Sequence, residues 1–210
     1  MPAPTTVQKT PGPKTKEERR EQILEAAIAV FGETGYHATN VADVIARAGV
    51  ARGTFYQYFE SKRQLFDELL DAMLGRLRAV IVHVNMAHPE KTVYVQLHEN
   101  VERILGVLFA ERALARILVA EAAGVDTELD RKLEAFYDGL ITLISETLQL
   151  GQNVGMVRSC DTALVATCIL GSVKELVYQH VLRGDRPVDV GAVAGEVMAY
   201  NLHGLFTRVG

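Results

Sequence analysis

The chain has 210 residues, of which 49% are hydrophobic, and a formal net charge of -4. This length allows one large domain or two small ones, and the hydrophobic content is sufficient for a packed core. The negative total excludes a protein that is basic throughout. However, residues 1–63 hold nine Lys and Arg against seven Asp and Glu, whereas the remainder holds thirteen against nineteen. The N-terminal part is therefore basic and the rest acidic.

The cysteine content and the apolar runs indicate a cellular compartment. Only Cys160 and Cys168 are present, and we expect them to be reduced, packed thiols. The first 22 residues contain no apolar run of the kind found in a secretory signal. The longest uncharged apolar stretches are shorter than the ~20 residues that a membrane-spanning helix needs. We therefore expect a cytoplasmic protein.

The N-terminus begins with a proline-rich segment. Four of the six prolines lie in residues 2–13, where no apolar periodicity is present. Such a segment cannot bury enough surface to fold, so we expect a flexible basic arm over residues 1–15. The arm is either a solubilising tail or a segment that contacts a polyanion.

Helical periodicity begins near Lys16 and predicts four helices in succession. The first carries apolar residues at helical spacing and ends at the sequence GETGY. A short helix follows over residues 40–48, with Thr39 as its N-cap, and Gly49 separates it from a third helix over residues 50–59. Ser61 is expected to cap a long fourth helix over residues 62–84.

The remaining chain predicts five more helices. They lie near residues 89–109, 111–122, 127–150, 161–184 and 187–207. Pro89 and Pro187 stand where a helix can start, because the first helical position needs no N–H donor. No segment alternates with the period of two that a strand requires. We therefore predict an all-α fold of about nine helices.

The two short helices joined by the sequence AGV have the arrangement of a helix-turn-helix, whose second helix enters the major groove of DNA. Phe55 and Phe59 are four residues apart and are expected to anchor that second helix. Its other side carries a cation, hydroxyls and rings that suit phosphate and base contacts: Arg52, Thr54, Tyr56 and Tyr58. Gly53 permits close approach to the duplex, and Lys62 adds charge at the start of the next helix.

The run GYHATNVADVIARAGVARGTFYQYFESKRQLFDELL resembles the signature of the TetR (tetracycline-repressor) family, with the match covering about residues 17–70. The resemblance implies a homodimeric transcriptional regulator, usually a repressor. It implies a three-helix DNA-binding domain over residues 16–63 and a helical ligand-binding and dimerisation domain over residues 64–210. It also implies DNA contacts by Thr39, Arg52, Gly53, Thr54, Tyr56, Tyr58 and Lys62. Ala51 departs from the family's usual Ser or Thr, which gives up roughly 1 kcal/mol of helix capping.

The C-terminal half offers candidates for two further surfaces. An apolar stripe on the last two helices is either plain core or an interface by its periodicity, and the resemblance implies a four-helix dimer interface. Its residues are Leu170, Val173, Val177, Val181, Val193 and Val197. Polar and aromatic residues on the central helices are expected to contact a ligand: His98, Arg103, Phe109, Tyr137, Ile141, Lys174 and Tyr178. The apolar surroundings favour a small hydrophobic effector, such as an acyl chain, an aromatic compound or a lipophilic drug.

The sequence contains no motif of a common enzyme class, so no catalytic residue, cofactor or metal is predicted. His98 and Glu102 are four residues apart, but two ligands do not form a metal site. We therefore predict a repressor that binds a palindromic operator as a homodimer and is released by its effector. An activator of the same fold, and a helical adaptor without sequence-specific DNA binding, remain as alternatives.

Overall fold

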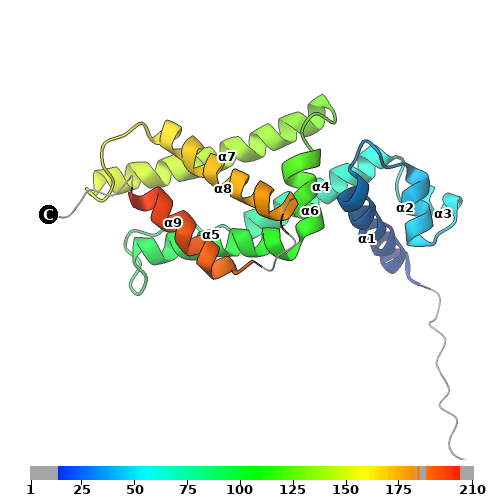
Figure 1. Ribbon diagram of the computed structural model, residues 1–210, viewed down its shortest axis with the longest axis horizontal. Helices are drawn as coiled ribbons and strands as arrows, with labels where there is room; N and C mark the ends of the chain where they lie inside the picture. The colour runs from blue at the N-terminus through cyan, green and yellow to red at the C-terminus, as the bar shows by residue number, and fades with distance from the viewer. Residues whose placement is uncertain (1–13, 183, 185–187, 204–210) are drawn as a thin grey trace, which may run out of the picture.

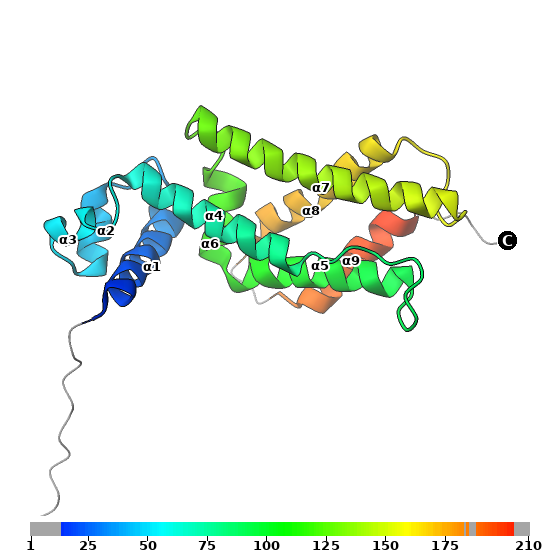
Figure 2. The ribbon, with the colours of Figure 1, turned by 180° about the vertical axis from the view of Figure 1, so that it is seen from behind.

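The computed structural model describes residues 14–182, 184 and 188–203, with nine α-helices, one π-helix and no β-strand in this range. The elements are α1 (Lys16–Thr34), α2 (Val41–Ala48), α3 (Arg52–Tyr56), α4 (Lys62–Val80), α5 (Val93–Ala110), α6 (Arg112–Arg116), the π-helix η1 (Ile117–Glu121), α7 (Thr127–Asn153), α8 (Thr162–Leu182) and α9 (Val190–His203). The all-α prediction is confirmed. Helices α1–α3 form a small unit at one end of an elongated molecule, and α4 runs from it into the larger bundle of α5–α9 (Figures 1 and 2).

The caps of α1 and α2 follow from local sequence. The Thr15 hydroxyl accepts a hydrogen bond from the Glu18 N–H, and the Glu18 carboxylate accepts one from the Thr15 N–H, which is a capping box. The predicted N-cap of α2 at Thr39 is wrong by one residue: the cap is Asn40, whose N–H donates to Asp43 at 2.8 Å. Of the predicted arm, residues 1–13 lie outside the described residues.

An aromatic cluster joins α1 to the start of α4. The ring centroid of Phe66 lies 5.4 Å from that of Phe31 and 4.5 Å from that of Tyr36, and all three residues are buried. These edge and tilted contacts are geometries that aromatic pairs favour. Phe66 of α4 therefore contributes to the core of the N-terminal unit.

The fourth helix ends four residues earlier than predicted, at Val80. Ile81 is already extended, and its neighbours bond to α5 instead of continuing the helix. Asn100 accepts from the Val82 N–H and donates to the Val82 carbonyl, at 2.9 and 2.6 Å. The Arg103 guanidinium donates to the Val80 carbonyl at 3.0 Å. These side-chain bonds satisfy the backbone groups that helix termination leaves free.

The C-terminal helices follow the predicted order with three corrections. Pro89 does not start a helix: α5 begins at Val93, where the Thr92 hydroxyl accepts the Val95 N–H. The predicted helix over residues 111–122 is divided into α6 and the π-helix η1. The last helix begins at Val190, whereas Pro187 and residues 204–207 lie outside the described residues. In the part of the chain that is described, no helix has the length and apolar character needed to cross a bilayer.

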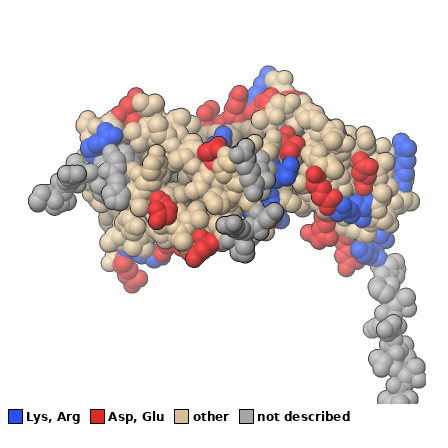
Figure 3. All heavy atoms as spheres, in the orientation of Figure 1, with Lys and Arg blue, Asp and Glu red and all other residues tan. Residues whose placement is uncertain are grey.

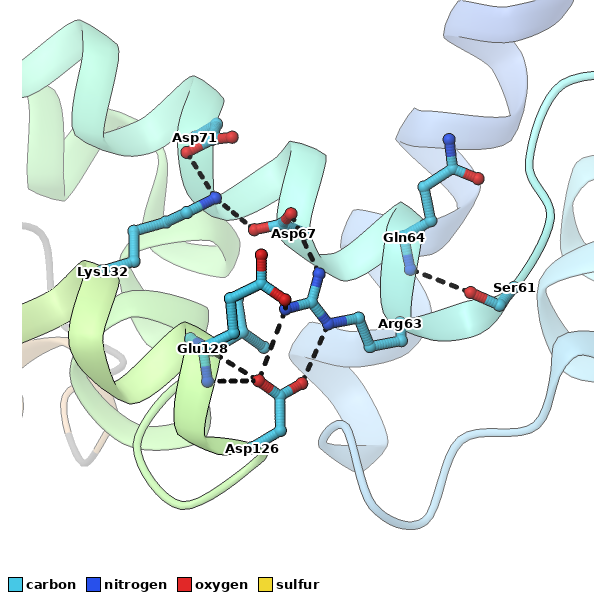
Figure 4. A network of polar contacts seen from close by, with 9 residues as sticks. Ser61, Arg63, Gln64, Asp67, Asp71, Asp126, Glu128 and Lys132 are labelled. Carbon is cyan, nitrogen blue, oxygen red and sulfur yellow. Dashed lines mark hydrogen bonds and ion pairs between the residues drawn. The ribbon is translucent and has the colours of Figure 1, made fainter.

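A polar network joins α4 to the first turn of α7 (Figure 4). Arg63 donates to the Asp126 carboxylate at 2.9 Å, and Asp126 also caps α7 by accepting the N–H groups of Glu128 and Leu129. Arg63 is the largest influence that lowers the pKa of Asp126 to about 2. Lys132 on α7 forms ion pairs with both Asp67 and Asp71, which lie one turn apart on α4. These contacts fix the angle between α4 and α7.

Replacing Arg63 with Gln should reduce the loss of stability on acidification between about pH 4 and about pH 2. The pKa of Asp126 is lower in the folded chain than the usual 3.8. The ionised carboxylate therefore adds to the free energy of unfolding above about pH 4, and this contribution is lost as the pH falls to about 2. Urea unfolding midpoints measured from pH 5 downward check this. Glu134→Gln, on an exposed site of α7, is the control, and parallel curves for Arg63→Gln and the wild type would contradict the prediction.

Candidate nucleic-acid interface and effector cavity

The recognition helix α3 is held in place from behind by two phenylalanines. It is five residues long, and Ala51 at its N-cap makes no side-chain capping bond. So short a helix is unstable alone, because nucleation is unfavourable. Phe55 and Phe59 are both fully buried, with ring centroids 5.9 Å apart. Burial of one such side chain contributes roughly 2 to 3 kcal/mol, which exceeds the roughly 1 kcal/mol that the absent cap costs.

The opposite side of α3 faces solvent. Arg52 and Gly53 are exposed, and the Tyr56 side chain is 45% exposed. The Arg52 guanidinium lies 5.8 Å from the centroid of the Tyr56 ring, a distance at which a cation is attracted to an aromatic face. Thr54 and Tyr58 are only partly exposed, and Tyr58 packs in part against the core. The outward surface therefore centres on Arg52, Gly53 and Tyr56.

Gly53 is open to solvent on its side-chain position. A Cβ atom placed there would meet no other atom within 4 Å, and the residue has no positive φ. The fold of the chain therefore does not require glycine at this position. The open position leaves room for close approach by an external surface, such as the edge of a DNA groove.

Two of the predicted DNA contacts are instead bonded within the chain. The Thr39 side chain is 1% exposed and donates to the Gly35 carbonyl at 2.7 Å. The Lys62 ammonium donates to the carbonyls of Tyr36 and Thr39 at 2.7 and 2.8 Å, and burial lowers the pKa of Lys62. Thr39 therefore shapes the turn between α1 and α2, and Lys62 ties α4 to that turn with one of its three N–H donors remaining for a phosphate.

Pairing with carboxylates leaves few free cations near α3. Figure 3 shows basic and acidic side chains closely mixed on the α1–α3 end of the molecule. Arg47 on α2 binds both oxygens of Glu33, and Arg20 on α1 pairs with Glu68. Arg47 on α2 has a carboxylate partner, whereas Arg52 on α3 has none among the described residues. Its charge is therefore available to a phosphate or a guanine edge.

A cavity of about 220 Å³ lies inside the C-terminal bundle, between the end of α4 and helices α5, α7, α8 and α9. The described side chains that line it include no aromatic ring, and most are aliphatic: Ile81, Val82, Val84, Leu97, Val101, Ile104, Leu140, Leu143, Ile144, Leu148, Ile169, Leu170, Val173, Val197, Met198 and Leu202. Asn100, Thr147 and Asn201 are its polar lining residues. Asn100 and Asn201 already bond to backbone groups, so the cavity suits an apolar chain.

Four of the predicted ligand contacts lie on the helices around this cavity without lining it. Tyr137 and Lys174 line a smaller neighbouring cavity of about 60 Å³, where the Lys174 ammonium lies 3.9 Å from the centroid of the Tyr137 ring. Burial raises the pKa of Tyr137. Arg103 faces a separate polar cleft and holds the end of α4, and His98 stacks on the Tyr94 ring.

The other three predicted contacts lie elsewhere. The Phe109 ring lies edge-on to His180, Ile141 packs in a small core beside the cavity, and Tyr178 is partly buried. None of the seven predicted residues lines the main cavity. Six of the seven predicted residues are polar or aromatic, whereas the cavity is built mainly from aliphatic residues that have the same periodicity as ordinary core. Asn100, a polar residue on the same face of α5 as the apolar Leu97, Val101 and Ile104, was the signal that could have pointed to it.

The described residues contain no group of three or more His, Cys, Asp or Glu that could hold a metal ion. The acidic residues of the polar network between α4 and α7 are instead in ion pairs with Arg63 and Lys132 (Figure 4). The two sites that the geometry supports are therefore the exposed side of α3 and the aliphatic cavity.

Two protein-family models match the chain. Residues 23–69 match the description "bacterial regulatory proteins, tetR family", and residues 66–204 match "YsiA-like protein, C-terminal region". Together the two matches extend over the N-terminal unit and the cavity-forming bundle.

Similar proteins include regulators of lipid metabolism. The chain is 26% identical to the fatty acid metabolism regulator protein of Bacillus subtilis over 93% of this chain and 100% of the relative. It is 28% identical to the transcriptional activator FasR of Mycolicibacterium smegmatis, over 87% and 81%. The structure of the fatty acid degradation regulator FadR from Bacillus halodurans superposes with a TM-score of 0.73 at 29% identity, over 93% and 100% of the two chains.

Replacing Gly53 with Ala should weaken binding to a specific DNA duplex by at least tenfold while leaving the fold intact. The added methyl group meets nothing within the chain, and alanine favours a helix by about 1 kcal/mol over glycine. Thermal unfolding, with an unchanged or slightly raised midpoint, and fluorescence anisotropy with labelled DNA would measure the two effects. Gly139→Ala, at an exposed and equally open position on α7, is the matched control. Equal DNA affinity for both variants would refute the close approach at residue 53.

Proposed function

Because the chain belongs to the tetR family of bacterial regulatory proteins and is a DNA-binding transcriptional regulator, we propose that it binds a palindromic operator as a homodimer and is released by an effector with a long aliphatic chain. The observation that carries this proposal is the cavity in the C-terminal bundle, whose lining is almost wholly aliphatic. The exposed side of α3 supplies the DNA-binding surface.

Pairing of two chains follows from the small size of that surface. One five-residue recognition helix contacts too few base pairs to select a site in a genome, and two-fold pairing on a palindrome doubles the contacts. In this arrangement Arg52 and Tyr56 of each subunit contact one half-site. The spacing between the two α3 helices then decides whether both half-sites can be occupied.

The exposed face of α8 and α9 is the surface we assign to pairing. The two helices lie side by side on the face of the bundle seen in Figure 1, and Figure 3 shows that few charged side chains cover it. Leu164 on α8 is 63% exposed and Tyr200 on α9 is 76% exposed. Large apolar side chains at such exposure mark an interaction surface when they share one face.

The residues expected from the sequence for this interface lie on the inner side of the same helices. Val177 and Val197 are buried within their own subunit, Leu170 and Val173 line the cavity, and Val193 packs partly against the core. The side chain of Val181 lies outside the described residues. Periodicity alone cannot distinguish the inner from the outer stripe of a helix. We therefore propose the exposed stripe of α8 and α9 as the pairing surface.

The chemistry of the effector follows from the cavity lining. A flexible alkyl chain can follow a cavity formed by branched aliphatic side chains, whereas a planar aromatic compound gains from ring stacking that this lining does not offer. Relatives that are named regulators of fatty acid metabolism and degradation match the chain over nearly its whole length. We therefore favour a fatty acyl effector among the hydrophobic classes.

The effector need supply only a small free energy. A shift of ~1.4 kcal/mol between two arrangements of the dimer changes operator affinity tenfold. Activation in place of repression is a second candidate, and it is favoured by the similarity to the activator FasR. Transcription from a reporter that carries the operator would decide between them, because loss of a repressor raises expression and loss of an activator lowers it. A helical adaptor, the remaining alternative, would show no sequence preference in a selection of genomic fragments.

Replacing Leu97 with Trp should separate effector binding from DNA binding. In the wild type, a saturated C16 fatty acid or its coenzyme A thioester should lower affinity for the selected operator at least tenfold. Leu97 lines the main cavity away from α6, so a larger ring there should fill the space and weaken binding of either probe at least tenfold, with operator affinity unchanged in their absence.

Tyr94→Trp is the matched control for this experiment, because Tyr94 is 48% exposed on the same helix and does not line the cavity. Calorimetry would measure probe binding, and anisotropy would measure operator binding. If Leu97→Trp binds both probes as tightly as the control does, the cavity is not the effector site. If neither probe binds the wild type, the fatty acyl class is wrong.

Replacing Leu164 with Glu should convert the dimer to a monomer and weaken operator binding at least tenfold, because a charge would be placed within an apolar pairing surface. Light scattering after gel filtration would give the mass. Val154→Glu is the control: Val154 is 58% exposed at the C-cap of α7 and belongs to neither α8 nor α9. A monomeric wild type, or a dimeric Leu164→Glu variant, would remove this face as the interface.

A further inference from the structure

The π-helix η1 contacts the N-terminal unit directly through Glu121. The Glu121 carboxylate accepts a hydrogen bond from the Tyr36 N–H at 3.2 Å. Gly35 is adjacent, with a φ of 81°, and a Cβ atom there would lie 2.8 Å from the same carboxylate oxygen. The backbone of the α1–α2 turn (residues 35–40) therefore approaches Glu121 as closely as a chain without a side chain allows.

Further backbone groups of the α1–α2 turn are also hydrogen-bonded. The Tyr36 carbonyl accepts from the Lys62 ammonium at 2.7 Å, and the Gly35 carbonyl accepts from the Thr39 hydroxyl at 2.7 Å. The Tyr36 ring is buried against Phe66. Because α2 begins directly after this turn, a displacement of the turn moves α2 and the attached α3 together.

The opposite side of η1 belongs to the effector region. Leu118 and Val119 line the smaller cavity of about 60 Å³, on the side of the bundle nearest the N-terminal unit. This cavity and the main one share five lining residues: Ile81, Ile104, Leu140, Leu170 and Val173. A molecule that extends from the main cavity past these side chains meets η1. One five-residue element thus has the cavity on one side and the DNA-binding unit on the other.

The backbone of η1 has the wide turn of a π-helix, to which ordinary α-helical bonding is the alternative register. The Ala122 N–H bonds to the Ile117 carbonyl at 2.9 Å, which is the i to i+5 bond of a π-helix. Such single turns are rare, and they occur frequently at functional sites within α-helices. A change to α-helical bonding removes the wide turn and rotates the residues that follow by roughly one helical position, or about 100°. That rotation would carry the Glu121 carboxylate away from the Tyr36 N–H.

We propose that Glu121 is a positioning residue for DNA recognition: its bond to the Tyr36 N–H transmits the register of η1, and so the occupancy of the cavity, to α2 and α3. This route does not pass through the length of α4, although Lys62 at the start of α4 holds the same turn. The role of the effector rests on the proposed function. The mechanical part, which is the coupling between the smaller cavity and the α1–α2 turn, does not.

Hydrogen exchange of the Tyr36 amide tests the mechanical part without DNA or effector. Val173→Phe places a ring in the smaller cavity, against Leu118 and Val119, and should raise the Tyr36 exchange rate at least fivefold. Glu121→Ala should raise it at least tenfold by itself and make it insensitive to Val173→Phe. Glu121→Gln keeps an acceptor oxygen and should behave as the wild type does. Leu140→Phe, which fills the same space, serves if Val173→Phe does not fold.

Glu134→Ala is the control for a lost carboxylate, since Glu134 is exposed on α7. Unchanged Tyr36 protection in Glu121→Ala would overturn the inference. So would an equal response to Val173→Phe with and without the Glu121 carboxylate, because the two sites would then be independent. If Glu121 has only a structural role, Glu121→Ala lowers stability and its effect on Tyr36 exchange adds to that of Val173→Phe. If Glu121 couples the two sites, the effects of the two substitutions on Tyr36 exchange are not additive.

The same variants in operator binding test the regulatory consequence. With Glu121 present, Val173→Phe should weaken operator affinity at least fivefold; in the Glu121→Ala background it should change affinity by less than twofold. The two parts fail separately. Coupled exchange at Tyr36 with no response of operator affinity to the C16 probes leaves the relay standing and removes the fatty acyl effector, whereas independent exchange removes the relay whatever the probes do.

Discussion

Burial of Phe55 and Phe59 holds the DNA-binding surface in place. Helix α3 has five residues and no side-chain cap, so its position depends on these two rings and not on its own hydrogen bonds. With both rings committed to the core, Arg52 and Tyr56 are turned outward and Gly53 lies open between them. The geometry of recognition is therefore a property of the core of the N-terminal unit.

Helix α4 and the α1–α2 turn connect that unit to the effector region. Phe66 of α4 packs in the aromatic cluster with Phe31 and Tyr36, while Ile81, just beyond its other end, lines the cavity. The ion pairs in Figure 4 fix α4 against α7. Glu121 of η1 adds a second, shorter connection to the turn. A bundle joined to a DNA-binding unit at two points can reorient it with small internal movements, which suits control by an effector.

The cavity and the exposed face of α8 and α9 use opposite sides of the same helices. Leu170 and Val173 point toward the cavity, whereas Leu164 is exposed on the outer side of α8. In the proposed dimer, a molecule that fills the cavity would therefore press on the helices that we assign to pairing, and a change in their packing would alter the distance between the two α3 helices. The aliphatic lining explains why the polar residues first expected to bind the ligand, such as Arg103 and Tyr137, lie beside the cavity and not in it.

The sequence by itself determined the helical fold, the order of the helices and the outward placement of Arg52 and Tyr56, because local periodicity, caps and the glycine-marked turn are encoded by neighbouring residues. Only the tertiary structure decided three features: the end of α4 at Val80, the π-helical turn that ends at Glu121, and the hydrogen bonds that Lys62 and Thr39 make within the chain. The end of α4 and the position of Lys62 depend on hydrogen bonds between residues far apart in the chain, Glu121 of η1 is bonded to Tyr36, and Thr39 is buried by the surrounding fold. The cavity is of the same kind: aliphatic residues at helical spacing are identical in sequence whether they close on one another or leave a space between them.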